Sequence, residues 1–271
     1  MIETSAEDVL ELFCTSVATR QRFEAWKTDP RRVEVVPVVM AHRTRVLYGL
    51  TESDVRRICR ETEHALGDVR RQVGESVPEI VDWHPNFAFT HTFHACVEHI
   101  GTAPTYQQFR KFALDEQTGR RMLGDPSRRI IRRLVESGRY SERRARAAMR
   151  WRIGNAYYGF LREVYTLVQL RSRGMDLRVH PLADALFRVD AWAGRRALSL
   201  RVGNSKFRKG LNAGRKTRTE ELLSGILPPL HFDSIELEAA TRFGEVHLPS
   251  AAHLDRAAAR IIGLNRPGAS S

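Results

Sequence analysis

GFLREVYTLVQLRSRG at 159–174, ALFRVDAW at 185–192 and ALSLRVGN at 197–204 are the stretches that decide the fold. The first belongs to a helix that we expect from Gly154 to Gly174. Its apolar residues recur at the spacing of one helix face: Tyr157, Leu161, Val164 and Val168. The other two stretches alternate apolar and polar residues, as strands do.

Further strands are expected on both sides of this pair. They lie at 176–181, 234–240 and 244–249, with a helix at 217–225. The region from 154 to 249 therefore reads as helix, three strands, helix and two strands. Together with the helical segments before it, this order predicts an α+β protein: a helical N-terminal region followed by an α/β core with a mixed sheet.

The second and third strands predict a hairpin. A short turn at Ala193-Gly194 sets Trp192 opposite Arg195, and the same register sets Val189 opposite Leu198 and Phe187 opposite Leu200. One face is then apolar, and the other carries Arg188, Asp190, Ser199 and Arg201. Glu163 lies at the edge of the apolar stripe of the preceding helix, so we expect its carboxylate to reach the same sheet.

A glutamate on a helix, an aspartate near the end of a strand, a hairpin and a charged third strand together resemble the PD-(D/E)XK nuclease superfamily. The resemblance covers roughly 154–249, under half of the chain, and implies a restriction-endonuclease-like core. It implies that Glu163 and Asp190 hold Mg²⁺ and that the catalytic set is Glu163, Asp190, Ser199 and Arg201. Mg²⁺ suits carboxylate oxygens, polarises a phosphate and lowers the pKa of bound water.

The sequence departs from the family pattern at the D/E-x-K tripeptide, where it has Ser199-Leu200-Arg201. Serine is neutral, and arginine clamps a phosphate but does not handle a proton as a lysine does. In family members with serine here, the next helix supplies the acid. Glu220 or Glu221 would take that place, with Lys206, Lys209 or Lys216 as the displaced cation. The ordinary alternative is that Asp190 and Glu163 form ion pairs with neighbouring arginines.

The charge of the chain favours a polyanionic partner. Lysine and arginine number 44 against 32 acids, which leaves a net charge of +12, and 120–152 alone contains twelve arginines against three acids. Within it, 126–152 predicts a helix, a glycine turn and a second helix. Basic residues concentrated in this way are typical of phosphate-backbone binding, although a solvated helix surface has the same composition.

Two groups of basic residues are therefore predicted to contact nucleic acid, with DNA as the expected form. The first is Arg128, Arg129, Arg132, Arg133, Arg143 and Arg144. The second lies in the glycine-containing loop at 203–216 and comprises Lys206, Arg208, Lys209, Arg215 and Lys216. A mobile surface loop is the alternative for the second group. The protein can act in a complex with other proteins or as a homo-oligomer.

The remaining features bound the interpretation. We expect an arginine-rich helical domain at 1–153, the nuclease-like domain at 154–249, and a short helix with a disordered tail at 250–271. Capping boxes predict helices that start after Ser5 and Thr51, and 33–40 reads as an edge strand because it contains Pro37. We expect a cytoplasmic protein that does not interact with membranes, because no signal peptide or apolar span is visible.

Three readings of function follow. The first is a metal-dependent nuclease that uses Mg²⁺. The second is a catalytically inactive nuclease-fold subunit that binds DNA or RNA within a larger complex, and the third is a protein-interaction scaffold. The histidines and the cysteine at 91–99 point around a helix rather than to one side, which disfavours a metal site there.

Overall fold

The computed structural model describes residues 2–202 and 218–263, and the protein is mostly helical, with 61% helix and small sheets. It divides into two compact units. Among the described residues, the sheet unit comprises 2–48, 162–202, 218–241 and 247–263, and the helical unit comprises 49–161 and 242–246. The predicted combination of helices with a mixed sheet is confirmed at this level. No described helix is both long and apolar enough to cross a membrane.

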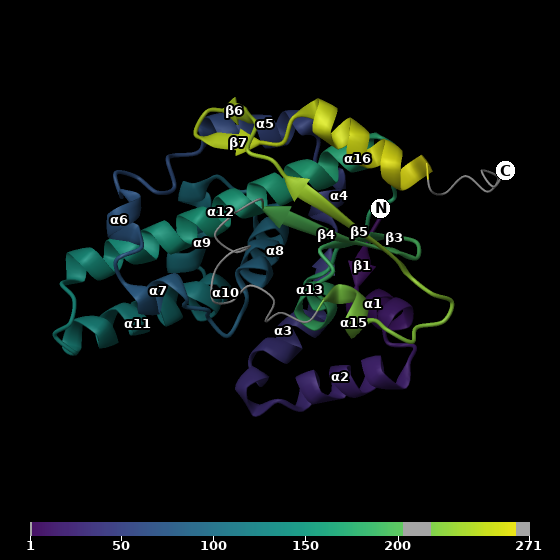
Figure 1. Ribbon diagram of the computed structural model, residues 1–271. Coiled ribbons are helices and arrows are strands. Elements are labelled where there is room, and N and C mark those ends of the chain that lie inside the picture. Colours follow the sequence, from purple (N-terminus) through teal and green to yellow (C-terminus); the bar gives the residue numbers. More distant parts are fainter. Residues whose placement is uncertain (1, 203–217, 264–271) are drawn as a thin grey trace. The chain divides into compact units, whose positions relative to one another are not determined.

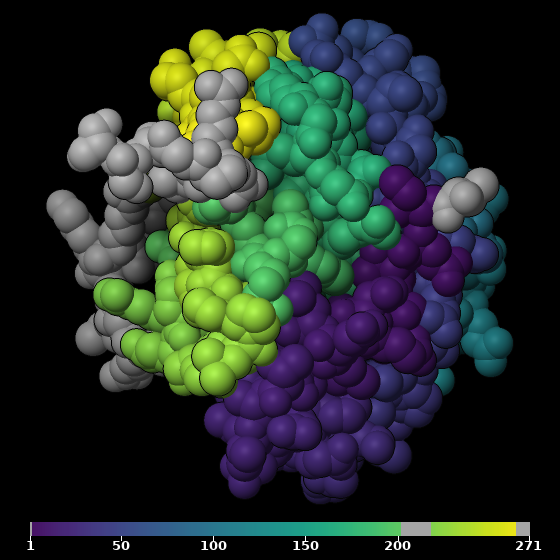
Figure 2. All heavy atoms as spheres, turned by 90° about the vertical axis from the view of Figure 1, so that its right-hand side faces the viewer, coloured from purple at the N-terminus to yellow at the C-terminus, as the bar shows by residue number. Residues whose placement is uncertain are grey.

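The sheet unit brings the N-terminus together with the C-terminal half of the chain (Figures 1 and 2). Its N-terminal elements are β1 (Thr4–Ser5), α1 (Ala6–Phe13), α2 (Val17–Thr28), η1 (Pro30–Arg32), α3 (Val35–Ala41), β2 (Arg43–Thr44) and α4 (Val46–Gly49). Its later elements are the end of α12 (Glu142–Ser172), α13 (Pro181–Phe187), β3 (Ala191–Ala193), β4 (Arg196–Val202), α15 (Thr219–Leu222), β5 (His231–Leu237) and α16 (Ala251–Gly263).

The main sheet is mixed and has the order β3-β4-β5. Strand β4 pairs antiparallel with β3 and parallel with β5, and α15 lies on the connection between the two parallel strands (Figure 1). Before β3, Arg178 forms a single antiparallel bridge with Trp192, so the predicted strand at 176–181 is reduced to one bridge. Helix α16 lies beside β5, because Arg260 donates a hydrogen bond to the Ser234 carbonyl.

The predicted hairpin forms, but its predicted pairing is wrong by two residues and its turn by one. Trp192 pairs with Ala197 rather than Arg195, and the turn occupies Gly194 and Arg195 rather than Ala193 and Gly194. Because a shift of two residues matches the period of a strand, the side chains of β4 stay on their predicted faces. Leu198 and Leu200 are buried, whereas Ser199 is half-buried and Arg201 is exposed.

The predicted strand at 185–192 is wrong over its first half, because 181–187 form helix α13. Pro181 occupies the first turn, where its missing N–H costs nothing, and the His180 side chain accepts a hydrogen bond from the Leu182 N–H. The helix packs against α1, where the ring of Phe13 lies 5.8 Å from Phe187. Tertiary burial of these apolar residues decides in favour of a helix.

The helical unit contains most of the remaining helices. They are α5 (Glu52–Glu61), α6 (Arg71–Gly74), α7 (Pro78–Val81), α8 (Phe89–Ile100), α9 (Tyr106–Asp115), α10 (Gln117–Gly119), the π-helical turn η2 (Arg120–Gly124), α11 (Asp125–Glu136) and the first part of α12. The short strands β6 (Thr241–Phe243) and β7 (Val246–Leu248) pair with each other, and each includes residues of both units.

Helix α12 is one continuous helix, so the predicted start at Gly154 is wrong. Gly154 remains inside it because any side chain there would meet the Ala65 backbone and the side chain of Leu66. The predicted apolar stripe is confirmed, since Tyr157 and Leu161 are fully buried. Gly138, with φ of 71°, follows the end of helix α11, as expected.

Two further local predictions have opposite outcomes. The capping boxes are confirmed, because the side chains of Ser5 and Thr51 each accept a hydrogen bond from the N–H three residues on. The edge strand at 33–40 is wrong, because Val35–Ala41 form helix α3. Pro37 falls in the first turn of that helix, where a backbone N–H has no helical acceptor in any case.

Candidate functional site

Glu163 and Asp190, which we call the acidic pair, come together in the sheet unit. Glu163 lies on α12 and Asp190 directly precedes β3. Each residue keeps some exposed surface, but protein atoms enclose the two carboxyl groups. No ion pair joins either carboxyl group to a described residue. The alternative of simple pairing with neighbouring arginines therefore fails for the described residues.

The two carboxyl groups strongly influence each other. Removal from water raises the pKa of Glu163 well above its usual value, and the negative charges of Asp190 and Asp184 raise it further. Burial and then Asp184 raise the pKa of Asp190 to about 8. The acidic pair thus retains a proton at neutral pH, because the protein does not readily hold both charges at once.

Hydrogen bonds and positive charge near Asp190 only partly offset this. The Leu200 N–H donates to Asp190 Oδ2 at 2.6 Å, and Arg201 lies close enough to lower the pKa of Asp190. Arg201 is exposed, so its guanidinium remains accessible to a ligand. Ser199 turns its hydroxyl to the Arg188 carbonyl at 3.5 Å.

Arg188 occupies an unusual backbone position between α13 and the acidic pair. Its φ of 57° places it in the left-handed region, which a residue with a side chain seldom adopts. Its carbonyl accepts from the hydroxyls of Ser199 and Thr219, the latter at 3.2 Å. This conformation ends α13 and turns the chain so that Asp190 enters the sheet beside β4.

Sequence reasoning missed Asp184, the third acidic residue at this site. It lies on α13, a helix that was predicted as a strand, and its charge raises the pKa of both members of the acidic pair. The Pro181 that opens the helix was the available signal. The expected third acid, Glu221, instead accepts a hydrogen bond from the Arg218 N–H at 3.3 Å, and neither Glu220 nor Glu221 shifts the pKa of the acidic pair.

Among 2–202 and 218–263, no group of three or more His, Cys, Asp or Glu side chains is placed to hold a metal ion. The histidines of α8 accordingly do not form such a group. A site made of two carboxylates is not covered by that finding. Mg²⁺ is commonly held by one or two carboxylates and several waters, so the donor chemistry of the acidic pair suits it.

In the helical unit, the predicted nucleic-acid-binding arginines are all exposed. We call Arg128, Arg129, Arg132, Arg133, Arg143 and Arg144 the arginine face. Arg128 pairs with Asp125 and Arg144 donates to Ser76, whereas the other four form no ion pair with a described residue. The predicted loop residues Lys206, Arg208, Lys209, Arg215 and Lys216 lie outside the described part of the chain.

Comparisons with protein families, with curated proteins and with solved structures find no match for this chain. The resemblance to the PD-(D/E)XK superfamily consequently depends on the residues and their arrangement alone.

Proposed function

We propose that the sheet unit is a metal-dependent nuclease site that cleaves phosphodiester bonds of nucleic acid, with DNA as the expected substrate. The acidic pair is the observation that carries the proposal. Two enclosed carboxyl groups repel each other and lack an ion-paired partner among the described residues. Such an arrangement costs stability unless a proton or a cation is bound, and perturbed carboxyl groups of this kind concentrate at functional sites.

The order of elements supports a restriction-endonuclease-like core. It runs from α12 through the bridge at Arg178 to the antiparallel pair β3 and β4, and then through α15 to β5, which is parallel to β4. Glu163 lies on a helix, as the resemblance expects of one metal-holding acid, whereas Asp190 directly precedes β3 rather than lying near the end of a strand.

Each residue at the site has a distinct proposed role. Glu163 and Asp190 would hold Mg²⁺ by their carboxylate oxygens, and the Leu200 N–H fixes the orientation of the Asp190 carboxyl. Bound there, Mg²⁺ would polarise the phosphate and lower the pKa of the attacking water. Arg201 would bind the phosphate as a fixed cation, because its guanidinium stays protonated. Ser199 would contribute a neutral hydroxyl near the site.

A second candidate function is an inactive nuclease-fold subunit that only binds nucleic acid. The tripeptide Ser199-Leu200-Arg201 favours it, because it lacks both an acid and a lysine. This candidate predicts binding that weakens steeply with salt, needs no divalent cation and leaves the substrate intact.

The test is a cleavage assay with the full chain. Single-stranded, duplex and branched DNA are incubated with Mg²⁺, Mn²⁺ or EDTA, and the products are separated on denaturing gels. We expect cleavage that requires the cation and falls at least about 100-fold in Glu163→Gln and in Asp190→Asn, a loss typical of electrostatic groups at a reaction centre.

Glu221→Gln is the matched control, because it removes a carboxylate from the same unit that does not act on the acidic pair. It should cleave at the wild-type rate. Equal cleavage by wild type and Asp190→Asn would exclude the acidic pair from the chemistry. Salt-sensitive binding by the wild type without cleavage of any substrate would favour the second candidate.

A further inference from the structure

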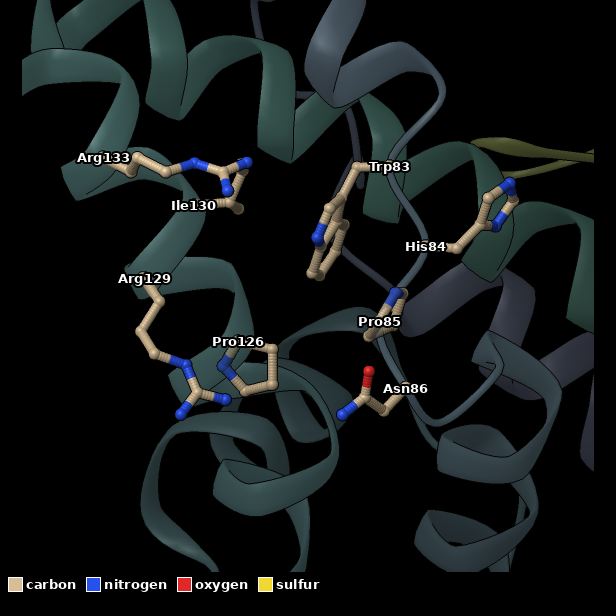
Figure 3. A pocket seen from close by; sticks show the side chains of 8 residues that line it. All are labelled: Trp83, His84, Pro85, Asn86, Pro126, Arg129, Ile130 and Arg133. Atoms are coloured by element: carbon tan, nitrogen blue, oxygen red, sulfur yellow. The ribbon is translucent and has the colours of Figure 1, made fainter. Parts of the chain in front are cut away.

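A pocket of about 320 Å³ lies in the helical unit (Figure 3), and neither residue of the acidic pair lines it. Two segments form it: the loop 83–86 after α7, and one side of α11. Its lining includes Trp83, Asn86, Pro126 and Ile130, together with Arg129 and Arg133 of the arginine face. This volume is at the lower end of the range for small-molecule sites, so it suits one compact ligand rather than a duplex.

The charge in the pocket is entirely positive. Arg129 and Arg133 are exposed, form no ion pair with a described residue and are four residues apart on α11, so they lie on the same helix face. Like charges at this spacing destabilise a helix by a few tenths of a kcal/mol. No acidic residue lines the pocket. An anion between the two guanidinium groups would remove this repulsion, and phosphate matches their fork-shaped donors.

Trp83 gives the pocket an aromatic wall that is held in place. Part of its ring packs against the buried cluster around Ile130 and Leu134 and lies edge-on to Phe89, with 6.2 Å between ring centroids. Arg152 donates to the Trp83 carbonyl at 3.3 Å. In Figure 3, the ring stands between the α11 side chains and Pro85. A rigid, half-buried indole is suited to stacking with a flat ring.

Beside the tryptophan, Asn86 offers hydrogen-bonding groups to a flat ring bound in the pocket. Asn86 is exposed, and its amide carries both donors and acceptors. In Figure 3, the Asn86 amide and the Arg129 guanidinium lie on either side of Pro126. The pocket therefore combines a place for an anion, a flat apolar surface and an amide within a few residues of each other.

We propose that this pocket binds a single nucleotide, with its phosphate between Arg129 and Arg133 and its base against Trp83. The nucleotide is either free or one unit of a single-stranded nucleic acid, because both sources present the same chemistry. This pocket shares no residue with the proposed nuclease site, and binding here requires no cleavage.

The test measures binding to the full chain by calorimetry at low salt. The probes are adenosine 5′-monophosphate, adenosine, inorganic phosphate and a 12-nucleotide thymidylate strand. We expect adenosine 5′-monophosphate to bind at least about tenfold more tightly than either adenosine or inorganic phosphate, since each of these lacks one of the two contacts. Binding of the mononucleotide alone identifies a free-nucleotide site, whereas tighter binding of the strand identifies a site for single strands.

The decisive variant is the double substitution Arg129→Ala with Arg133→Ala, matched by Arg60→Ala with Arg70→Ala. Both pairs remove two exposed arginines from the helical unit, but only the first lines the pocket. The first should weaken mononucleotide binding at least tenfold, and the second should change it less than twofold. Because all four side chains are exposed, the variants should fold, and their melting curves check this.

Three results would overturn the proposal. They are equal losses in the two double variants, the absence of binding of both the mononucleotide and the strand to the wild type, and equal affinity for inorganic phosphate and the mononucleotide. In Trp83→Leu, we expect the preference for the mononucleotide over inorganic phosphate to disappear while phosphate binding persists.

Discussion

Replacement of Asp190 by asparagine should stabilise the protein in the absence of divalent cations. Asparagine has nearly the same shape, and its amide oxygen can still accept from the Leu200 N–H, so the change mainly removes a charge. The pKa of Asp190 is raised from 3.8 to about 8. The folded state therefore holds this proton more tightly than the unfolded chain does. The proton on Asp190 therefore stabilises the folded protein; this contribution to the free energy of unfolding is complete below pH 4 and is lost as the pH rises towards 8.

The raised pKa also gives the size of the effect. One pKa unit corresponds to about 1.4 kcal/mol, so the shift sets an upper bound of roughly 6 kcal/mol on the cost of ionising Asp190 in the folded protein. Relaxation and water penetration reduce this cost. We expect the variant to be at least about 1 kcal/mol more stable than wild type at pH 8, which is about 2–4 °C in Tm.

The assay is urea unfolding of both proteins in EDTA at pH values from 5 to 9. Groups common to both proteins cancel in the difference of unfolding free energies, which should grow with pH and level off above pH 8. Addition of Mg²⁺ at pH 8 should raise the Tm of the wild type and leave the variant unchanged, because ligands stabilise the state that binds them. A difference in unfolding free energy between Asp190→Asn and wild type that does not vary with pH would refute the reasoning. For the control Glu221→Gln, we expect no difference from wild type that grows with pH.

Three further predictions concern stability and are checked by the same unfolding experiment. Asp233→Ala removes the carboxylate that pairs with buried Arg196 and should cost about 3–5 kcal/mol; a loss under 1 kcal/mol would contradict a buried pair. Arg188→Gly should be about 1–2 kcal/mol more stable than Arg188→Ala, because only glycine adopts a φ of 57° without strain; equal stabilities would oppose this. Thr51→Ala removes the cap that Asp54 shares and should cost about 1 kcal/mol, and no change would contradict the capping box.

The sequence predicted those features that depend on local chemistry. Capping boxes involve residues three apart, and the apolar stripe of α12 follows the helical period, so both were readable from the sequence. Strand β4 was also predicted, and from Leu198 to Arg201 its residues alternate between buried and more exposed positions. The positions of Ser199 and Arg201 on the polar face followed from that alternation.

Features that depend on tertiary contacts were missed. Residues 185–192 alternate well enough to resemble a strand, but α1 and α3 bury 181–187 as a helix. That helix needs a left-handed residue at its end, and Arg188 gives no local sign of adopting one. Because α13 was missed, so was Asp184, and the third acid was sought on α15 instead.

The carboxyl groups of Asp233 and Asp190, both in the sheet unit, have different charged neighbours. This difference is the reason that the acidic pair is a functional candidate. Asp233 on β5 meets the buried guanidinium of Arg196 on β4, so its charge is balanced within the sheet. Asp190 lies beside the same strand and receives one N–H and the more distant influence of exposed Arg201, while burial and Asp184 oppose its ionisation, and Asp190 in turn opposes the ionisation of Glu163. The acidic pair must therefore retain a proton unless a cation binds to it. Such a pair lowers the stability of the ionised protein, and this cost is expected where ligand binding, rather than folding, determines which residues are present.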